Sequence, residues 1–380
     1  MRGLETWGFA VERGFWAEGR LGLAAWANTR WSGSAKSATI HNSEKESDER
    51  SLGEVFVRSV TVFLMPLFRV KTGAILLCLA GAGTLRADLA RFQYTEVHMG
   101  MQARIVIYAA SEVEAQAGAR AAFRRIEELD SILSDYRVSS DLRRLCDRAG
   151  TGPVRVHRDL FRLLSLAQEI SEKTNGAFDV TVGPLVQLWR QARRSGKLPD
   201  AADIRSARAL VGWRNVVVRK ADGTVELKLP GMRLDLGGIA KGYACQEALK
   251  VLHRRGLHMG MVEIGGDLAL GHAPPNKKGW AVEIPFAPRP KDRLRHLRDT
   301  CVSTSGDTQQ FVEIGGVRYS HIVDPSTGVG LTNRLGVTVI AREGWLADAL
   351  STAICVLGEE EGRRLASSYR GVEVFIQRAE

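Results

Sequence analysis

The chain has 380 residues, of which 44% are hydrophobic, and a formal net charge of +10. This composition excludes a disordered or fibrous protein and is enough for a sizeable core in one large domain or two closely packed ones. The positive charge suits nucleic acid, an anionic membrane surface or a phosphate-bearing ligand. Because the sequence contains no motif of a known nucleic-acid-binding module, we expect no nucleic-acid partner.

The segment before the folded part has the layout of an export signal. Residues 65–87 open with Met65 and two nearby cations, continue with a short apolar run and end in small residues. The apolar run is shorter than the roughly 20 residues of a membrane-spanning helix, and a buried apolar helix is the alternative. Residues 1–64 show no hydrophobic period, so we interpret them as a non-native or disordered extension. The sequence therefore predicts an exported, periplasmic protein and leaves peripheral membrane association open.

From residue 91 onward, short β-rich runs alternate with helices, which predicts one compact, two-lobed α+β domain over residues 91–380. We expect a strand at Ala103–Tyr108 and a helix that starts at the capping box formed by Ser111 and Glu114. The further predicted elements are a helix at 159–173, a hairpin around Asp222-Gly223, strands at 261–264, 280–284, 317–322 and 336–341, a solvated loop at 289–298 and a helix at 346–357.

Two glycine-containing segments have both a structural and a functional interpretation. Residues 174–185 (TNGAFDVTVGPL) follow a helix, which Asn175-Gly176 could simply end; alternatively, the small residues let a flat ligand approach the backbone beside Phe178. Residues 234–242 (LDLGGIAKG) lead into a helix whose N-terminal N–H groups, together with Lys241, suit an anion. A glycine turn with a surface lysine is the alternative, because neither a Walker loop nor a GxGxxG motif is present.

Polar residues cluster later in the chain. Residues 263–267 (EIGGD) could form a bulge or a turn, and nothing local favours a function. His321 stands among ordinary turn residues, and an isolated histidine is more often structural than catalytic. Asp348 and Thr352 lie at i and i+4 on one face of the last predicted helix, where a carboxylate and a hydroxyl can offer hard oxygens to Mg²⁺. The alternative is that Asp348 is only a helix-terminal residue.

In this order, the segments resemble the ApbE-type FAD:protein FMN transferases over about residues 92–378. The combination is far more specific than any one motif. Two departures are Met101, where many relatives have Thr, and Gln246, where Asp is usual. The matching pieces are HMGM (98–101), LSDYR (133–137), GAFDVTVGPL (176–185), LDLGGIAKGYA (234–244), EIGGD (263–267), STSGD (303–307), YSHIVDPSTG (319–328) and ADALSTA (347–353).

The resemblance implies a T-fold-related α+β domain with mixed or antiparallel sheets and flanking helices. It implies Mg²⁺ as cofactor and FAD as substrate. Magnesium is expected on Asp348, the Thr352 hydroxyl and the Gly238 carbonyl. The expected FAD contacts are Met99, Tyr136, Ala177, Phe178, Asp179, Asp235, Lys241 and Ile322.

The implied reaction moves FMN from FAD to a Thr or Ser hydroxyl of an acceptor protein and releases AMP. Asp348 is the residue most expected to be essential, and His321 or Asp307 is expected to accept the hydroxyl proton. The implied acceptors are flavoproteins, including flavin-carrying subunits of membrane electron-transfer complexes. Two other functions stay open: an FAD pyrophosphatase that releases FMN and AMP, and a periplasmic FAD-binding protein without chemistry.

Overall fold

The computed structural model describes residues 88–378, except Pro288 and residues 307–309. The predicted extension (1–64) and export signal (65–87) lie outside the described residues, and so does Asp307, one of the two expected proton acceptors. Within the described part of the chain, no helix has the length and apolar character that crossing a membrane requires.

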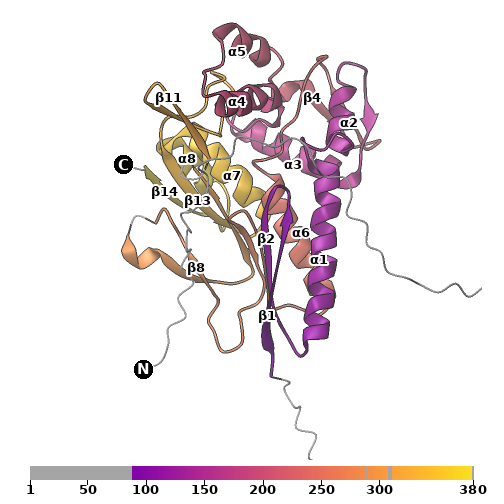
Figure 1. The fold of residues 1–380 in the computed structure, drawn as a ribbon, viewed down its shortest axis with the longest axis vertical. Coiled ribbons are helices and arrows are strands. Elements are labelled where there is room, and N and C mark those ends of the chain that lie inside the picture. Colours follow the sequence, from indigo (N-terminus) through magenta and orange to yellow (C-terminus); the bar gives the residue numbers. More distant parts are fainter. Residues whose placement is uncertain (1–87, 288, 307–309, 379–380) are drawn as a thin grey trace, which may run out of the picture. The chain divides into compact units, whose positions relative to one another are not determined.

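Within these residues, seven strands form one antiparallel sheet with the order β1-β2-β6-β7-β10-β13-β14 (Figure 1). The α+β prediction is therefore confirmed. The strands are β1 (Ala90–His98), β2 (Met101–Ala109), β6 (Gly260–Ile264), β7 (Asp267–Leu270), β10 (Thr300–Ser305), β13 (Leu335–Ala341) and β14 (Glu373–Arg378).

Helices cover one face of this sheet. Figure 1 shows α8 (Glu359–Ser367), α7 (Gly344–Leu357), α6 (Ala240–Arg254) and α1 (Glu112–Leu133) as a row of neighbours. The α1 helix begins where the capping box predicts, since Ser111 Oγ accepts a hydrogen bond from the Glu114 amide at 3.3 Å.

Because successive side chains of a strand point to opposite faces of the sheet, the buried residues divide into one core on each face. On β2, Ile105 and Ile107 pack under the helices, whereas Val106 packs on the opposite face. On β13, Val339 and Ile340 divide in the same way. Both faces are covered, which explains why β13 is buried along its whole length.

A hairpin of β8 (Trp280–Glu283) and β9 (Leu294–Leu297) covers the face opposite the helices. The prediction of a solvated loop over residues 289–298 is wrong at β9. Arg295 and Glu373 of β14 form an ion pair at 3.1 Å, so the charge of this segment is partly compensated within the fold. Trp280 and Val282 supply the apolar side of the hairpin.

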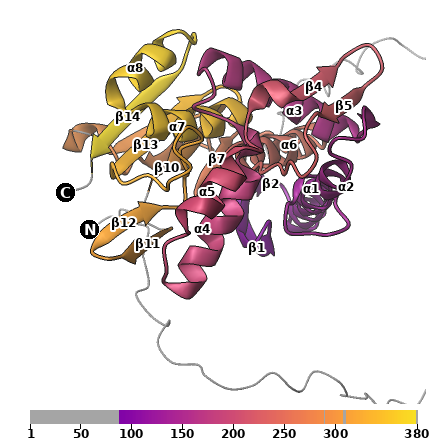
Figure 2. The ribbon, with the colours of Figure 1, turned by 90° about the horizontal axis from the view of Figure 1, so that it is seen from above.

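The other elements flank the main sheet. Figure 2 shows α4 beside the hairpin of β11 and β12, where the rings of Trp189 and Tyr319 lie 5.0 Å apart. These elements are α2 (Asp141–Asp147), β3 (Val154–Arg155), α3 (Arg158–Lys173), the 3-10 turns η1 (Val180–Val182), η2 (Trp213–Asn215) and η3 (Pro290–Asp292), α4 (Gly183–Ser195), α5 (Ala201–Arg208), β4 (Val216–Arg219), β5 (Thr224–Leu227), β11 (Phe311–Ile314) and β12 (Val317–Ser320).

Candidate active site

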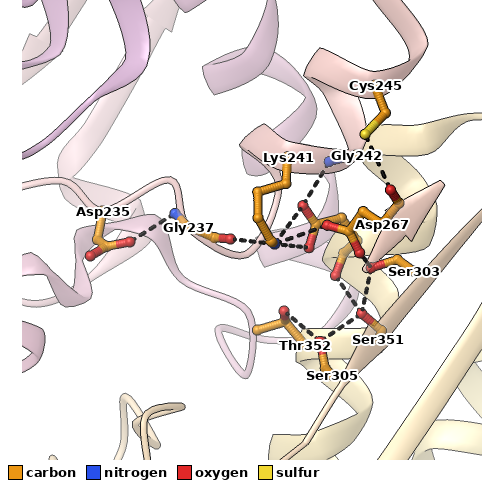
Figure 3. Close-up of polar contacts among 11 residues, drawn as sticks. Asp235, Gly237, Lys241, Gly242, Cys245, Asp267, Ser303, Ser305, Ser351 and Thr352 are labelled. Carbon is orange, nitrogen blue, oxygen red and sulfur yellow. Dashed lines mark hydrogen bonds and ion pairs between the residues drawn. The ribbon is translucent and has the colours of Figure 1, made fainter. Parts of the chain in front are cut away.

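Polar side chains from distant segments meet at the N-terminal end of α6 (Figure 3). The loop before α6, the first turn of α6, the start of β7, the end of β10 and the middle of α7 all contribute. The residues are Asp235, Gly237, Lys241, Gly242, Asp267, Ser303, Ser305, Asp348, Ser351 and Thr352.

Strand and helix periods explain why these side chains converge. On β10, Ser303 and Ser305 lie on the same face as buried Cys301, which points toward α7. On α7, Ser351 and Thr352 lie three and four residues after Asp348 and therefore share its face. Ser305 Oγ lies 2.8 Å from Ser351 Oγ and 3.4 Å from Thr352 Oγ1.

A lysine between two buried carboxylates forms the centre of the cluster. Lys241 Nζ lies 2.9 Å from Asp267 Oδ2 and 3.3 Å from Asp348 Oδ1. Both carboxylates are 1% exposed, whereas the lysine side chain is a quarter exposed. Lys241 Nζ also donates to the Gly237 carbonyl at 3.1 Å, which connects the cluster to the loop before α6.

Asp348 also caps α6 from the neighbouring helix. Its Oδ2 accepts a hydrogen bond from the Gly242 amide at 3.0 Å, in the first turn of α6. This amide has no partner within its own helix, and the positive end of the helix dipole favours a carboxylate there. The two helices approach so closely that a Cβ on Gly242 would lie 2.1 Å from the Gly344 carbonyl oxygen. Glycine is therefore required at position 242 by packing.

The cluster carries more negative than positive charge when all of its groups are ionised. Burial and the neighbouring Asp267 raise the pKa of Asp348 to about 7, although Lys241 opposes the shift. Burial alone would lower the pKa of Lys241, but the two carboxylates raise it above its usual range. Two carboxylates facing one ammonium leave a buried negative charge that a divalent cation would compensate.

The donor set beside this charge fits Mg²⁺. A Cβ on Gly238 would lie 2.9 Å from Thr352 Oγ1, so the backbone of Gly238 runs directly beside the Thr352 hydroxyl. The structure thus brings Gly238, Asp348 and Thr352, the three predicted metal ligands, to one place. Carboxylate, hydroxyl and carbonyl oxygens are hard ligands, which Mg²⁺ prefers.

A second acidic group lies elsewhere, on α1 and α3. Glu128, His157 and Asp159 offer ligand atoms within 4.8 Å of one another. The guanidinium of Arg125 lies 2.7 Å from Asp159 and 2.8 Å from Glu128, so both carboxylates already have a cation. This group is therefore less suited to a metal ion than the cluster at α6.

Arg190 of α4 links two of the predicted FAD contacts. It donates to Asp235 Oδ2 at 2.7 Å, and its guanidinium lies 4.2 Å from the centre of the Tyr136 ring. It also donates to Asp135. Asp235 Oδ1 in turn accepts from the Gly237 amide at 2.8 Å. The network joins the 133–137 segment to the loop that carries Gly238, one of the predicted metal ligands.

A cleft of about 890 Å³ opens next to this region. Its lining includes Ala177 and Asp179, two predicted FAD contacts, together with Arg214 and Arg364. Val356 also lines it and lies one turn beyond Thr352 on α7, which separates the two residues by about 6 Å along the helix axis. A ligand with a phosphate at the metal site could extend into this cleft.

Asp179 has a structural role in the wall of the cleft. It is 7% exposed, and its carboxylate accepts hydrogen bonds from the Thr181 amide at 2.8 Å and the Trp213 amide at 2.9 Å. Burial raises the pKa of Asp179 despite these bonds. Its contact with FAD stays a prediction, and the observed bonds position the loop of Trp213.

The remaining predicted site residues lie in other parts of the fold. Met99 has a φ of 52° in the turn between β1 and β2, Phe178 is 4% exposed within the main core, and Ile322 is 8% exposed. His321 is exposed, and its Nδ1 lies 3.1 Å from the Gln310 carbonyl oxygen. The FAD contacts of these residues stay predictions.

Sequence reasoning did not identify Asp267 or Arg190 as site residues. Asp267 follows Gly265 and Gly266, whose φ values of 56° and 94° form the turn between β6 and β7. A glycine turn ending in a carboxylate at the start of a buried strand is the signal that could have indicated it. Arg190 lies in a helix among other cations, and its sequence context gives no such signal.

Comparisons with known proteins cover this whole region. Residues 99–376 match the ApbE family. The FAD:protein FMN transferase of Treponema pallidum is 33% identical over 325 residues, which are 80% of this chain and 90% of that protein. The one from Vibrio cholerae is 34% identical over 251 residues, or 64% and 75% of the two chains. The crystal structure of the Pseudomonas stutzeri flavinyl transferase ApbE in its apo form has a TM-score of 0.68 and 31% identity, covering 77% of this chain and 92% of that one.

Proposed function

The chain belongs to the ApbE family, and we propose that it transfers the FMN half of FAD to a Thr or Ser hydroxyl of an acceptor protein and releases AMP. The observation that carries the proposal is the buried group of Asp348, Lys241 and Asp267 beside Thr352 and Gly238, at the N-terminus of a helix. Such a group suits the charge of a metal-bound diphosphate.

We further propose that Asp348, the Thr352 hydroxyl and the Gly238 carbonyl hold Mg²⁺. When bound, the ion neutralises charge on the phosphate oxygens of FAD. Lys241 adds a second cation at this position, and the first turn of α6 adds its dipole. Asp267 holds Lys241 in place through the ion pair at 2.9 Å.

The proposed reaction is a displacement at phosphorus. The acceptor oxygen forms a bond to the FMN-side phosphorus, the bond between that phosphorus and the bridging oxygen breaks, and AMP leaves with that oxygen. His321 is the proposed base. If its Nδ1–H donates to the Gln310 carbonyl, the lone pair is on Nε2, which receives the proton of the acceptor hydroxyl.

We propose that the rest of FAD binds along the cleft and against the residues that Arg190 connects, Tyr136 and Asp235. The ring of Tyr136 is 73% exposed and can pack on a flat heterocycle. Arg190 holds this ring and Asp235 in a fixed relation. Ala177 leaves space for the ligand because its side chain is small.

The acceptor is proposed to be an exported flavoprotein, and the transferase itself to act in the periplasm. This part of the proposal rests on the signal-like sequence of residues 65–87. The proposed acceptors are subunits of membrane electron-transfer complexes. We also propose that the transferase associates peripherally with the membrane.

The test incubates the protein with FAD, Mg²⁺ and an acceptor flavoprotein or a threonine-containing peptide, followed by mass spectrometry. A peptide that gains the mass of FMN in the wild type, and not with Asp348→Asn, supports the transferase. Free FMN and AMP with unmodified acceptor would instead indicate a pyrophosphatase. FAD that stays intact while bound would indicate a binding protein.

A further inference from the structure

Three histidine rings lie together at the opposite end of α6 from the charged cluster. His253 is in the last turn of α6, His258 is in the loop that leads to β6, and His272 follows β7. Their ring centroids are 5.3 Å (His253–His258), 5.4 Å (His258–His272) and 6.0 Å (His253–His272) apart. The chain has eight histidines, so three at one point is a marked concentration.

Backbone hydrogen bonds fix the two loops that carry His258 and His272. The His272 amide donates to the His258 carbonyl at 2.9 Å, and the neighbouring Gly271 amide donates to the Gly260 carbonyl at 2.8 Å. The Asp299 amide donates to the Gly271 carbonyl at 3.1 Å. The backbone positions of His258 and His272 are therefore set by the fold, while both of their rings remain exposed.

A carboxylate orients the ring of His272. Its Nδ1 lies 2.6 Å from Asp299 Oδ1. A carboxylate accepts at this distance, so Nδ1 carries the hydrogen in the neutral ring and Nε2 carries the lone pair. Histidines that bind metal ions commonly donate their other ring N–H to a carboxylate in this way.

His253 contributes a nitrogen without a partner in the protein. Its Nε2 is buried and accepts or donates no hydrogen bond of acceptable geometry. Burial and the adjacent His258 and His272 lower the pKa of His253, although the nearby His258 backbone and Asp299 oppose the shift. The ring is therefore neutral near pH 7, which is the form that binds a metal ion.

We propose that His253, His258 and His272 form a binding site for a borderline divalent transition-metal ion, with Zn²⁺ as the expected ion. Three rings around one tetrahedral ion, with nitrogens at about 2.0–2.1 Å, have centroids about 5 Å apart, close to the observed spacing. The His258 and His272 rings stack with 21° between their planes, and the His253 ring is tilted to both. The three ring nitrogens do not lie within 4.8 Å of one another in the structure. His258 and His272 therefore have to rotate toward the ion, and Asp299 has to follow His272 to keep its hydrogen bond. Both histidines are exposed, and exposed side chains change rotamer readily.

This site is separate from the proposed active site. Lys241 and His253 are twelve residues apart on α6, which corresponds to about 18 Å along the helix. The two donor sets also differ in chemistry: imidazole nitrogens suit Zn²⁺, whereas the oxygens around Asp348 suit Mg²⁺. The proposal therefore does not depend on the flavin chemistry. A bound ion would tie the end of α6 to the loop after β7.

The test uses the full chain without a histidine tag, treated with a chelator and then kept in excess Mg²⁺ to occupy the oxygen sites. Zn²⁺ is titrated calorimetrically into the wild type, the double variant His258→Ala/His272→Ala and the control His296→Ala. His296 is an exposed histidine on β9, away from the three rings. We expect one Zn²⁺ per chain in the wild type and the control, and affinity at least about 100-fold lower in the double variant.

Two further measurements locate the ion. Histidine side-chain NMR should show Zn²⁺-dependent shifts of the ring nitrogens of His253, His258 and His272, with His296 unchanged. Asp299→Asn, which weakens the orienting hydrogen bond, should lower the affinity by about tenfold. Zn²⁺ affinity equal in the wild type and the double variant would overturn the proposal, because the ion would then be held elsewhere. An absence of Zn²⁺ binding to the wild type would also overturn it.

Discussion

The ammonium group of Lys241 lies 2.9 Å from Oδ2 of Asp267, a carboxylate that is 1% exposed. Asp267 starts β7, and Lys241 lies in the first turn of α6, so the ion pair attaches the helix end to the central sheet. Ser303 of β10 donates to the other oxygen of Asp267. The lysine is thereby held beside Asp348, at the place where a phosphate-bearing ligand would need positive charge.

Asp348→Asn should abolish Mg²⁺-dependent FMN transfer. The amide oxygen can still accept the hydrogen bond from the Gly242 amide, so the α6 contact is kept while the charged metal ligand is lost. Since a bound metal ion contributes several kcal/mol to transition-state stabilisation, we expect a rate loss of at least about 100-fold. The measurement is FMN transfer by mass spectrometry, with Asp222→Asn in the exposed β4–β5 turn as control. Full transfer by Asp348→Asn would contradict the proposed metal site.

The stability of the protein without Mg²⁺ should depend on the ionisation of Asp348. Its pKa is about 7 in the folded state and near 3.8 when unfolded, so between these values the folded state holds a proton that the unfolded state has lost. The contribution of Asp348 to the free energy of unfolding therefore falls as pH rises through this range and levels off above about pH 7.

Chemical denaturation in chelator at about pH 5, 6, 7 and 8 tests this. The difference in free energy of unfolding between the wild type and Asp348→Asn reports Asp348 together with its effect on Asp267 and Lys241, because the titrations of groups that do not interact with Asp348 cancel. We expect this difference to shift against the wild type as pH rises, and Mg²⁺ to reverse the shift at about pH 8. A difference that does not vary with pH would show that the carboxyl has an ordinary pKa.

Gly242→Ala should destabilise the protein by about 2 kcal/mol or more, because the new methyl group meets backbone. Its Cβ would lie 2.1 Å from the Gly344 carbonyl oxygen and 2.9 Å from Asp348 Cβ, so α6 and α7 would have to separate. Gly118→Ala is the matched control. It too lies within a helix, but its nearest neighbour is the end of the Leu257 side chain, which can turn away.

Both substitutions gain about 0.5–1 kcal/mol of helix propensity, so the difference between them reports the cost of the backbone clash. Urea denaturation measures it. FMN transfer should fall with Gly242→Ala and stay close to the wild-type level with Gly118→Ala. Equal stability of the two variants would mean that α6 and α7 can move apart without cost.

Local patterns predicted much of the fold and part of the site. The capping box at Ser111 and the apolar period behind it predicted α1, and the i, i+4 spacing of Asp348 and Thr352 predicted a shared helical face. Asp267 was not assigned to the site: the glycine turn before it indicates a carboxylate at the start of a buried strand, but its pairing with Lys241 arises only in the tertiary fold. The strand β9 was missed because its two leucines, Leu294 and Leu297, are three residues apart among cations, so the segment shows no period of two and was predicted to be a loop.

Arg190→Met should lower both stability and FAD affinity. The guanidinium pairs with Asp135 and Asp235 and covers the Tyr136 ring, and its side chain is 19% exposed. Removing it leaves two carboxylates facing each other with little solvent, for which we expect a loss of about 2–3 kcal/mol. FAD affinity, measured by quenching of flavin fluorescence, should fall, because Arg190 no longer holds the Tyr136 ring and the loop of Asp235 together.

Arg363→Met is the control for that experiment. Arg363 forms an exposed i, i+4 pair with Glu359 on α8, and such pairs contribute only about 0.3–0.5 kcal/mol. A stability loss for Arg190→Met no larger than for Arg363→Met would mean that the two acids are solvated without their arginine.

His321→Ala should slow FMN transfer by about 100-fold or more without weakening FAD binding, since general bases contribute about 10²–10⁴ to a rate. His321→Gln separates catalysis from positioning, because glutamine can still donate to the Gln310 carbonyl but cannot accept a proton at neutral pH. If His321 is the base, both variants are slow, and both lose the rise in rate with pH that deprotonation of the imidazole gives the wild type. If the glutamine variant keeps the wild-type rate and pH profile, the ring only positions its loop, and the base must be sought among other groups near the acceptor hydroxyl.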